Sequence, residues 1–160
     1  MRNITSFLSK STIKSELAHV YVYDGYAVAT DGYRLVEIKL NDYCTEHIKD
    51  GYYTKEKWVA MSKAYSKKKL NIIAFMTAIA ENKVHEDMRK DYKYPDYKIL
   101  MPKSEDLKPI DTSSKFETSY IVDFLTMIDS ITIDLSLIKD NGKFIYYENA
   151  GIKMLLMKRN

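Results

Sequence analysis

Cysteine and histidine are scarce in this sequence of 160 residues, and their scarcity excludes several kinds of site. Cys44 is the single cysteine, so no disulfide forms within the chain, and a reducing, cytoplasmic location is the simple interpretation. His19, His47 and His85 stand far apart and lack the cysteine or carboxylate spacing of a zinc site. The five glycines form no glycine-rich phosphate loop. We therefore expect no metal ion and no cofactor.

Long hydrophobic runs are also missing. No stretch approaches the roughly 18 apolar residues that a membrane crossing needs, so no membrane span is predicted. No apolar stretch follows the charge at the N-terminus, so no secretory signal is expected. Charge of one sign does not dominate, because 25 basic and 22 acidic residues give a net charge of +3. Any contact with nucleic acid must therefore use a locally basic face.

Turn signals and β-forming residues dominate the start of the chain. Residues 1–45 are interpreted as one helix-plus-three-strands unit. A helix is predicted over residues 4–16, where hydroxyl residues that suit a helix N-cap accompany apolar ones. Asp24-Gly25 and Asp31-Gly32 are strong turn signals between segments rich in valine and tyrosine. The predicted strands are residues 19–23, 26–30 and 33–40.

Residues 110–160 repeat this plan in pattern, although few letters recur. Thr118 caps a predicted helix, and alternating apolar residues predict a strand over 131–137. Turns rich in Asn, Asp and Gly, at 140–142 and 149–151, then separate two further strands. This segment is interpreted as a second helix-plus-strands unit.

The middle of the chain follows a different period. Apolar spacing predicts a helical insertion over residues 52–90, and the stripe within 72–80 suits a core or a subunit interface. Residues 91–103 are bounded by prolines and predict a linker that is not helical throughout. The whole chain, 1–160, is predicted to be one α+β domain, with helices in one layer and an antiparallel sheet in the other.

Four segments carry recognisable sequence. Residues 29–35 are Ala-Thr-Asp-Gly-Tyr-Arg-Leu, and residues 94–102 are Tyr-Pro-Asp-Tyr-Lys-Ile-Leu-Met-Pro. Residues 116–128 carry the second predicted helix, and residues 154–159 are an apolar strand followed by basic residues. In this order the segments resemble those of bacterial DNA sliding clamps, the DNA polymerase III beta-subunit family, over a little more than half of the chain. The family has histidine where Tyr33 stands here.

The resemblance implies a DNA-clamp-like fold and a homo-oligomeric ring, with helices around duplex DNA and sheets joined edge to edge. It also implies a hydrophobic pocket that receives short linear peptides of DNA polymerases and clamp-loader proteins. In the family the loop and the tail that form this pocket belong to adjacent domains. The sequence leaves open whether they meet within one chain here. The matching positions are Leu17, Thr30, Gly32, Tyr33, Arg34, Leu35, Pro95, Leu100, Met154 and Leu156.

Lysines are densest between residues 55 and 69, and Lys10 and Lys14 of the first predicted helix could add to the same surface. Such a run is usually a solvated helix face. With the clamp resemblance, it is equally well a surface that contacts DNA phosphates without regard to base sequence. The candidate DNA-facing residues are Lys10, Lys14, Lys55, Lys57, Lys63, Lys67, Lys68 and Lys69.

Three hypotheses follow. The main one is a non-enzymatic DNA replication processivity or accessory factor, which encircles or cradles duplex DNA and docks partner peptides. The alternative is a clamp mimic or adaptor that binds a polymerase, a clamp loader or a resident clamp and modulates replication without encircling DNA. The third, an enzyme that uses the Asp31 loop, lacks partner residues at a supportive spacing.

Overall fold

The protein is described from a computed structural model that defines residues 2–10, 15–65, 71–80, 94–110, 115–128 and 134–158. Its strands are β1 (Val20–Tyr23), β2 (Tyr26–Thr30), β3 (Arg34–Lys39), β4 (Gly51–Tyr53), β5 (Lys108–Pro109), β6 (Ile138–Asp140), β7 (Phe144–Asn149) and β8 (Ile152–Met157). They form one 8-stranded sheet in the order β4-β1-β2-β3-β8-β7-β6-β5, and the neighbouring strands are antiparallel. The α+β class predicted from the sequence is therefore confirmed.

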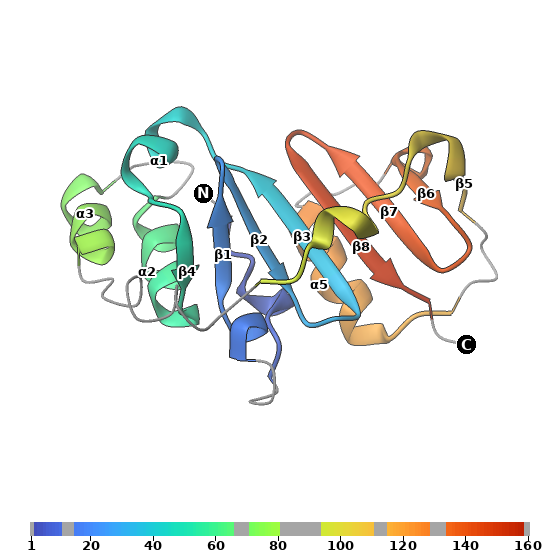
Figure 1. Ribbon diagram of the computed structural model, residues 1–160, viewed down its shortest axis with the longest axis horizontal. Helices are drawn as coiled ribbons and strands as arrows, with labels where there is room; N and C mark the ends of the chain where they lie inside the picture. The colour runs from blue at the N-terminus through green and yellow to red at the C-terminus, as the bar shows by residue number, and fades with distance from the viewer. Residues whose placement is uncertain are drawn as a thin grey trace.

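The sheet contains two meanders joined at its centre. β1-β2-β3 and β6-β7-β8 each run as consecutive strands, and β3 pairs with β8 between them (Figure 1). The β1–β2 turn requires two residues with positive φ, and Asp24 (51°) and Gly25 (76°) supply them. Ala150 (48°) and Gly151 (75°) do the same between β7 and β8. These two predicted turns fix the register of the hairpins that they close.

Helices pack on one face of the sheet, here called the inner face (Figure 1). α2 (Lys55–Ala64) and α5 (Thr118–Ile128) bury Trp58 and Phe124 against the strands. Alternate residues of β8, among them Met154, point into this inner core. Each large apolar side chain buried there contributes about 1.5–3 kcal/mol to folding. The described residues also form α1 (Asp42–His47), α3 (Ile72–Ala80) and the 3-10 helices η1 (Thr5–Phe7), η2 (Ser15–Ala18), η3 (Tyr97–Leu100), η4 (Ser104–Asp106) and η5 (Leu135–Leu137).

The opposite face of the sheet, the outer face, is crossed by residues 94–101, here called the strap (Figure 1). The backbone N–H of Tyr94 donates to the hydroxyl of Tyr52 at 2.8 Å, which ties the start of the strap to β4. The tyrosines of the strap pack with the outward-pointing side chains of the sheet. This outer cluster consists of Leu17, Val28, Leu35, Tyr52, Tyr94, Tyr97, Tyr146 and Leu155.

Two local predictions were wrong. In place of a helix over 4–16, the described residues form η1 and η2, and residues 11–14 lie outside them. Ile4 and Phe7 are both buried, and their spacing of three suits a 3-10 turn as well as an α-helix. In place of a strand over 131–137, the chain forms η5 followed by β6, while residues 129–133 lie outside the described part.

The middle segment also differs from its prediction. β4 and α1 were not predicted, because neither is long enough to show a period. The helical part begins only after β4, and residues 81–93 lie outside the described residues. In α3, Phe75 and Ala78 are buried, whereas Ile72, Ile73 and Met76 of the predicted stripe are exposed, so the stripe is wrong as a core at these three positions. The side chains of its other members, Ile79 and Ala80, lie outside the described part. Its use as a subunit interface stays a prediction. None of the helices in the described ranges has the length and hydropathy of a membrane span.

Candidate functional site

A pocket of about 340 Å³ opens on the outer face, beside the strap and the β2–β3 turn. Its volume is that of a small ligand cleft. Eight of the ten residues predicted for the partner-peptide pocket line it. They come from η2, from the β2–β3 region and from the strap, so these segments meet within one chain. The eight are Leu17, Thr30, Gly32, Tyr33, Arg34, Leu35, Pro95 and Leu100.

The prediction was wrong for Met154 and Leu156. These side chains are 0% and 1% exposed and belong to the inner core, on the other side of the sheet. Successive side chains of a strand point to opposite faces, and Leu155 pairs with Leu35 across β8 and β3. The pocket therefore receives Leu155 and Met157 from β8. The strand itself was predicted correctly, but the side chains that it turns toward the pocket were not.

Five lining residues were missed: Tyr97, Lys143, Phe144, Leu155 and Met157. Tyr97 lies inside the strap segment that carries the resemblance, so the motif itself pointed to it. The two residues of β8 follow from alternation once the pairing with Leu35 is known. Lys143 ends the β6–β7 turn and Phe144 begins β7, and only the tertiary fold brings them beside the strap.

The β2–β3 turn at the edge of the pocket is held by its own side chains. The Asp31 carboxylate accepts hydrogen bonds from the N–H groups of Tyr33 (3.0 Å) and Arg34 (3.1 Å). The Thr30 hydroxyl donates to the Arg34 carbonyl at 2.6 Å and accepts from the N–H of Gly32 at 3.1 Å. Gly32 adopts a φ of 94°, which a side chain would oppose. The Thr-Asp-Gly-Tyr-Arg sequence thus builds a turn that leaves Tyr33 61% exposed.

Arg34 connects the pocket to the helices. It is only 7% exposed, and its guanidinium pairs with Asp31 (Nε–Oδ2, 2.9 Å) and with Asp123 of α5. It also donates to the Ser6 carbonyl at 2.6 Å and lies 4.3 Å from the centre of the Tyr120 ring. A guanidinium with this many partners has a structural role, because planar donors are best satisfied by several fixed acceptors. Its charge is engaged within the fold.

Tyr97 fastens the strap to the sheet. Its side chain is buried, and its hydroxyl forms a hydrogen bond with Glu37 of β3. Glu37 in turn pairs with Lys153 of β8, whose Nζ lies 3.4 Å from Oε1. Burial, together with the hydrogen bond and negative charge of Glu37, raises the pKa of Tyr97 well above its ordinary value. The hydroxyl therefore stays protonated when the strap is in place.

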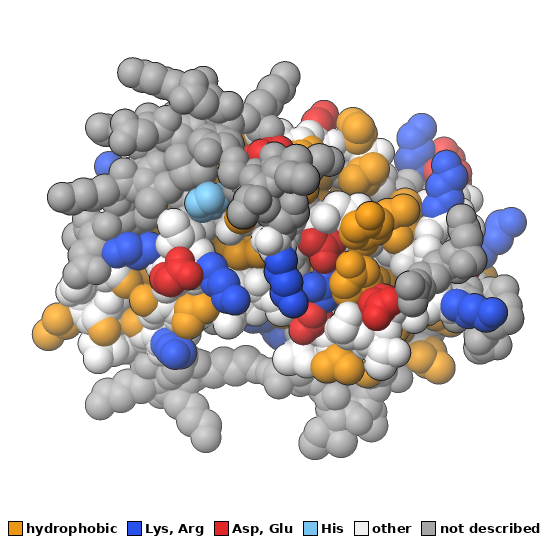
Figure 2. Space-filling view, turned by 90° about the horizontal axis from the view of Figure 1, so that it is seen from below, with side chains coloured by type: hydrophobic (Ala, Val, Ile, Leu, Met, Phe, Trp, Pro, Cys, Tyr) orange, Lys and Arg blue, Asp and Glu red, His pale blue; other side chains and the backbone are white. Residues whose placement is uncertain are grey.

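Large hydrophobic side chains remain exposed at the mouth of the pocket. Tyr33, Leu100 and Met157 are 61%, 53% and 44% exposed. Figure 2, which views the molecule from below, shows hydrophobic side chains gathered on the right-hand part of this face, with charged side chains beside them. An apolar cleft with exposed apolar side chains at its edge is typical of a binding site for a protein segment.

Four of the eight predicted DNA-facing lysines lie within the described residues, and of these Lys55, Lys57 and Lys63 share one helix, α2. Lys55 and Lys63 are exposed on α2, and Lys57 on the same helix is partly buried. Lys10 is exposed but follows η1 and lies on no helix. The prediction of Lys10 on a helix was therefore wrong. The remaining candidates lie outside the described residues: Lys14, Lys67, Lys68 and Lys69.

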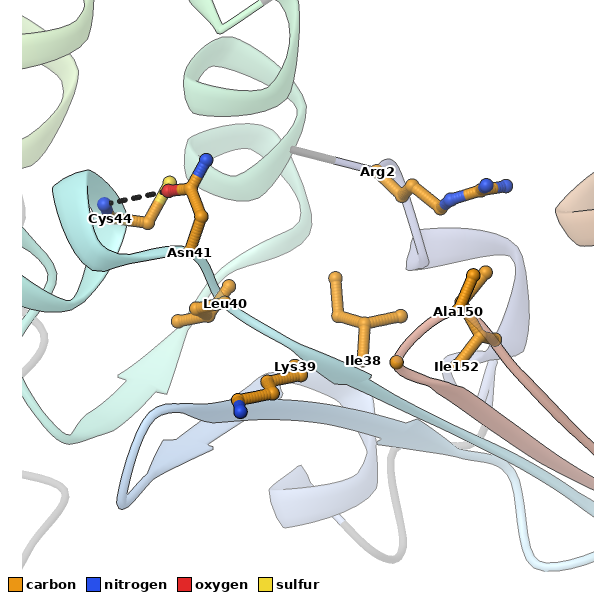
Figure 3. A pocket seen from close by; sticks show the side chains of 9 residues that line it. Arg2, Ile38, Lys39, Leu40, Asn41, Cys44, Ala150 and Ile152 are labelled. Atoms are coloured by element: carbon orange, nitrogen blue, oxygen red, sulfur yellow. Dashed lines mark hydrogen bonds between the residues drawn. The ribbon is translucent and has the colours of Figure 1, made fainter.

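A smaller hollow of about 140 Å³ lies at the other end of β3 (Figure 3). Arg2 and Lys39 border it, together with Asn41, which caps α1 by accepting a hydrogen bond from the Cys44 N–H at 3.0 Å. Cys44 is buried, and burial raises the pKa of its thiol, which makes it an inert packing residue. Over the described ranges, no three acidic, histidine or cysteine side chains are placed to hold a metal ion.

Comparisons with protein-family profiles, with curated proteins and with solved structures find no match.

Proposed function

We propose that this protein is a non-enzymatic replication accessory factor of the sliding-clamp type, acting in the cytoplasm, and that its outer-face pocket docks short peptides of DNA polymerases and clamp-loader proteins. The observation that carries the proposal is the meeting of Leu17, the 30–35 turn and the strap around one apolar pocket. These are the segments that the clamp resemblance assigns to peptide binding. Apolar walls that bury one or two anchor side chains are the usual means of capturing an extended peptide.

In the main form of the proposal, several copies surround duplex DNA. The exposed lysines of α2, Lys55 and Lys63, then contact phosphates without regard to base sequence. Such contacts hold DNA and still allow sliding. A polymerase tethered through the pocket then stays at a high effective concentration near its primer end.

A second form, an adaptor that does not encircle DNA, is favoured by α5. The solvent-facing residues of this helix carry no charge: Thr118, Ser119, Val122, Leu125 and Thr126. A helix that lines a DNA channel is expected to present lysine or arginine to the phosphates. An exposed apolar helix face, with Val122 56% and Leu125 40% exposed, fits contact with another protein better.

Peptide binding is tested with labelled peptides that copy the C-terminal tails of the DNA polymerases and clamp-loader subunits of the same genome. Fluorescence anisotropy is measured with the unaltered protein and with Leu100→Asp, which places a carboxylate at the mouth of the pocket. Ile73→Asp is the matched control, because Ile73 is an exposed hydrophobic residue on α3. We expect binding that Leu100→Asp abolishes and Ile73→Asp preserves. Binding that survives Leu100→Asp would contradict the pocket assignment.

The two forms of the proposal are separated by native mass. Light scattering is performed at low and moderate salt, with closed circular duplex DNA and with the same DNA made linear. A discrete oligomer that stays on circular DNA and leaves linear DNA supports the ring. A monomer or dimer that does not bind DNA but binds a polymerase tail supports the adaptor form.

A further inference from the structure

Among the described residues, two cationic side chains line the pocket, and they differ in their availability to a ligand. Arg34 is buried, and its guanidinium is engaged by two carboxylates and a carbonyl of the fold. Lys143 is exposed, and among the described residues its ammonium takes part in no ion pair or hydrogen bond. Lys143 is therefore the cation of this lining that is available to a ligand.

The backbone at Lys143 is fixed even though its side chain is exposed. The Asn141 side-chain oxygen accepts hydrogen bonds from the N–H groups of Lys143 (3.1 Å) and Phe144 (3.0 Å). The Lys143 carbonyl accepts from the N–H of Lys158 at 3.0 Å, which ties the turn to the end of β8. The ammonium is thus presented from a defined position beside the apolar wall.

The buried acid that borders the same hollow as Lys143 does not neutralise it. Asp140 is 5% exposed, and its carboxylate accepts from the Gly142 N–H at 2.6 Å and pairs with the ammonium of Lys158. Lys143 lies between the apolar pocket and a second, polar hollow that Glu105 and Asp106 border. It forms no ion pair with either of these exposed carboxylates.

We infer that the occupant of the pocket is a peptide segment of a partner protein in which an acidic residue stands next to the apolar anchor, and that Lys143 binds this carboxylate. This inference rests on the proposed peptide docking and adds the charge of the ligand to it. The apolar walls recognise the anchor side chain by burial. The single available cation adds selectivity, because opposite charges at the rim favour one partner and like charges penalise another.

The test uses three acetylated decapeptides that share a central Leu-Phe pair and differ in its flanking residues, which are Asp, Asn or Lys. Affinities are measured by anisotropy for the unaltered protein and for Lys143→Glu. An exposed rim pair of this kind changes affinity by about 1.5-fold to fivefold. We expect the unaltered protein to bind the Asp peptide most tightly, the Asn peptide less tightly and the Lys peptide most weakly. In Lys143→Glu this order of affinity should be reversed. The preference should shrink as salt is raised, because salt screens exposed charges.

Lys39→Glu is the matched control, since Lys39 is exposed at the opposite end of β3 and borders the other hollow. Lys39→Glu changes the net charge by the same amount as Lys143→Glu and should leave the order of peptide affinities unchanged. Equal affinity for all three peptides, or a reversal in Lys39→Glu as well, would overturn the role of Lys143 while leaving the dock in place. Binding of none of the three peptides, or of the polymerase tails, would instead overturn the proposed function itself.

Discussion

The two faces of the sheet are both hydrophobic, but one is covered completely and the other only in part. On the inner face, α2, α5 and η1 cover the strands, and side chains such as Trp58 and Met154 are fully buried. On the outer face, the strap covers the cluster around Leu35 and leaves a pocket of about 340 Å³ beside it. The same alternation along each strand supplies both faces.

This difference separates stability from binding. A closed face contributes the burial that folds the chain, and changes there are felt throughout the molecule. A partly open face keeps apolar surface available for a ligand. Substitutions on the inner face should therefore unfold the protein, whereas those at the pocket mouth should remove binding alone.

Two methionines of β8 provide the strongest test of this separation. Met154→Asp places a carboxylate in the inner core and should cost about 4 kcal/mol or more, because a buried charge without a partner is not tolerated. Met157→Asp changes a side chain that is 44% exposed at the pocket mouth and should cost under about 1 kcal/mol while abolishing peptide binding. Urea denaturation and anisotropy measure the two effects. Equal destabilisation by both changes would contradict the assignment of faces.

Arg34→Ala should have the next largest effect, a loss of about 3–5 kcal/mol, because it leaves the Asp31 and Asp123 carboxylates without their cation. Arg34→Lys should recover only part of the loss, since an ammonium cannot satisfy both carboxylates and the Ser6 carbonyl with the same geometry. Thermal and urea denaturation give the comparison. An Arg34→Ala protein as stable as the unaltered one would show that the ion pairs between the β2–β3 turn and α5 contribute little to folding.

High pH should loosen the outer face first. Burial raises the pKa of Tyr94, Tyr97 and Tyr146 above the ordinary value of 10.0. The folded state then keeps protons that the unfolded state releases, so stability is present below about pH 10 and falls as the pH rises further, by up to about 1.4 kcal/mol per pH unit for each group. Denaturation midpoints across this range measure the fall. Tyr97→Phe should make stability fall less steeply with pH. A stability that does not change above pH 10 would show that protonation of these tyrosines is not linked to folding.

Lys55→Glu with Lys63→Glu should have the smallest effect on folding, under about 0.5 kcal/mol, because both side chains are exposed. If the helical layer meets DNA, the pair should lower the slope of log affinity against log salt by about 2. Glu56→Lys, on the same helix, is the opposite-sign control. An unchanged salt slope would remove α2 from the DNA-binding surface and strengthen the adaptor form.

Much of the sheet could be predicted because its turns are encoded locally. The Asp24-Gly25 and Ala150-Gly151 pairs supply the positive φ values that their hairpins need, and the strands follow at the predicted places. The helix over 4–16 failed for the opposite reason. Its buried residues, such as Phe7, are placed by tertiary contacts, and their short-range pattern fits more than one local structure.

The lining residues that belong to the motifs could be predicted from the sequence. Those whose position depends on strand pairing could not. The Thr30–Leu35 turn, Pro95 and Leu100 lie where the resemblance implied. The choice of Met154 over Leu155 depended on the register of β8 against β3, and a shift of one residue exchanges the faces. Lys143 had no local signal, because it reaches the pocket only through the pairing of β7 with β8.

An NMR titration with a polymerase-tail peptide that binds in the anisotropy assay locates the binding face directly. If the outer-face pocket is the dock, amide shift changes concentrate on the outer face and its rim, at Gly32, Tyr33, Leu100 and Met157, with little change along α5. Changes centred on Val122 and Leu125, with the rim unaffected, would contradict this assignment and move partner binding to the inner, helical side.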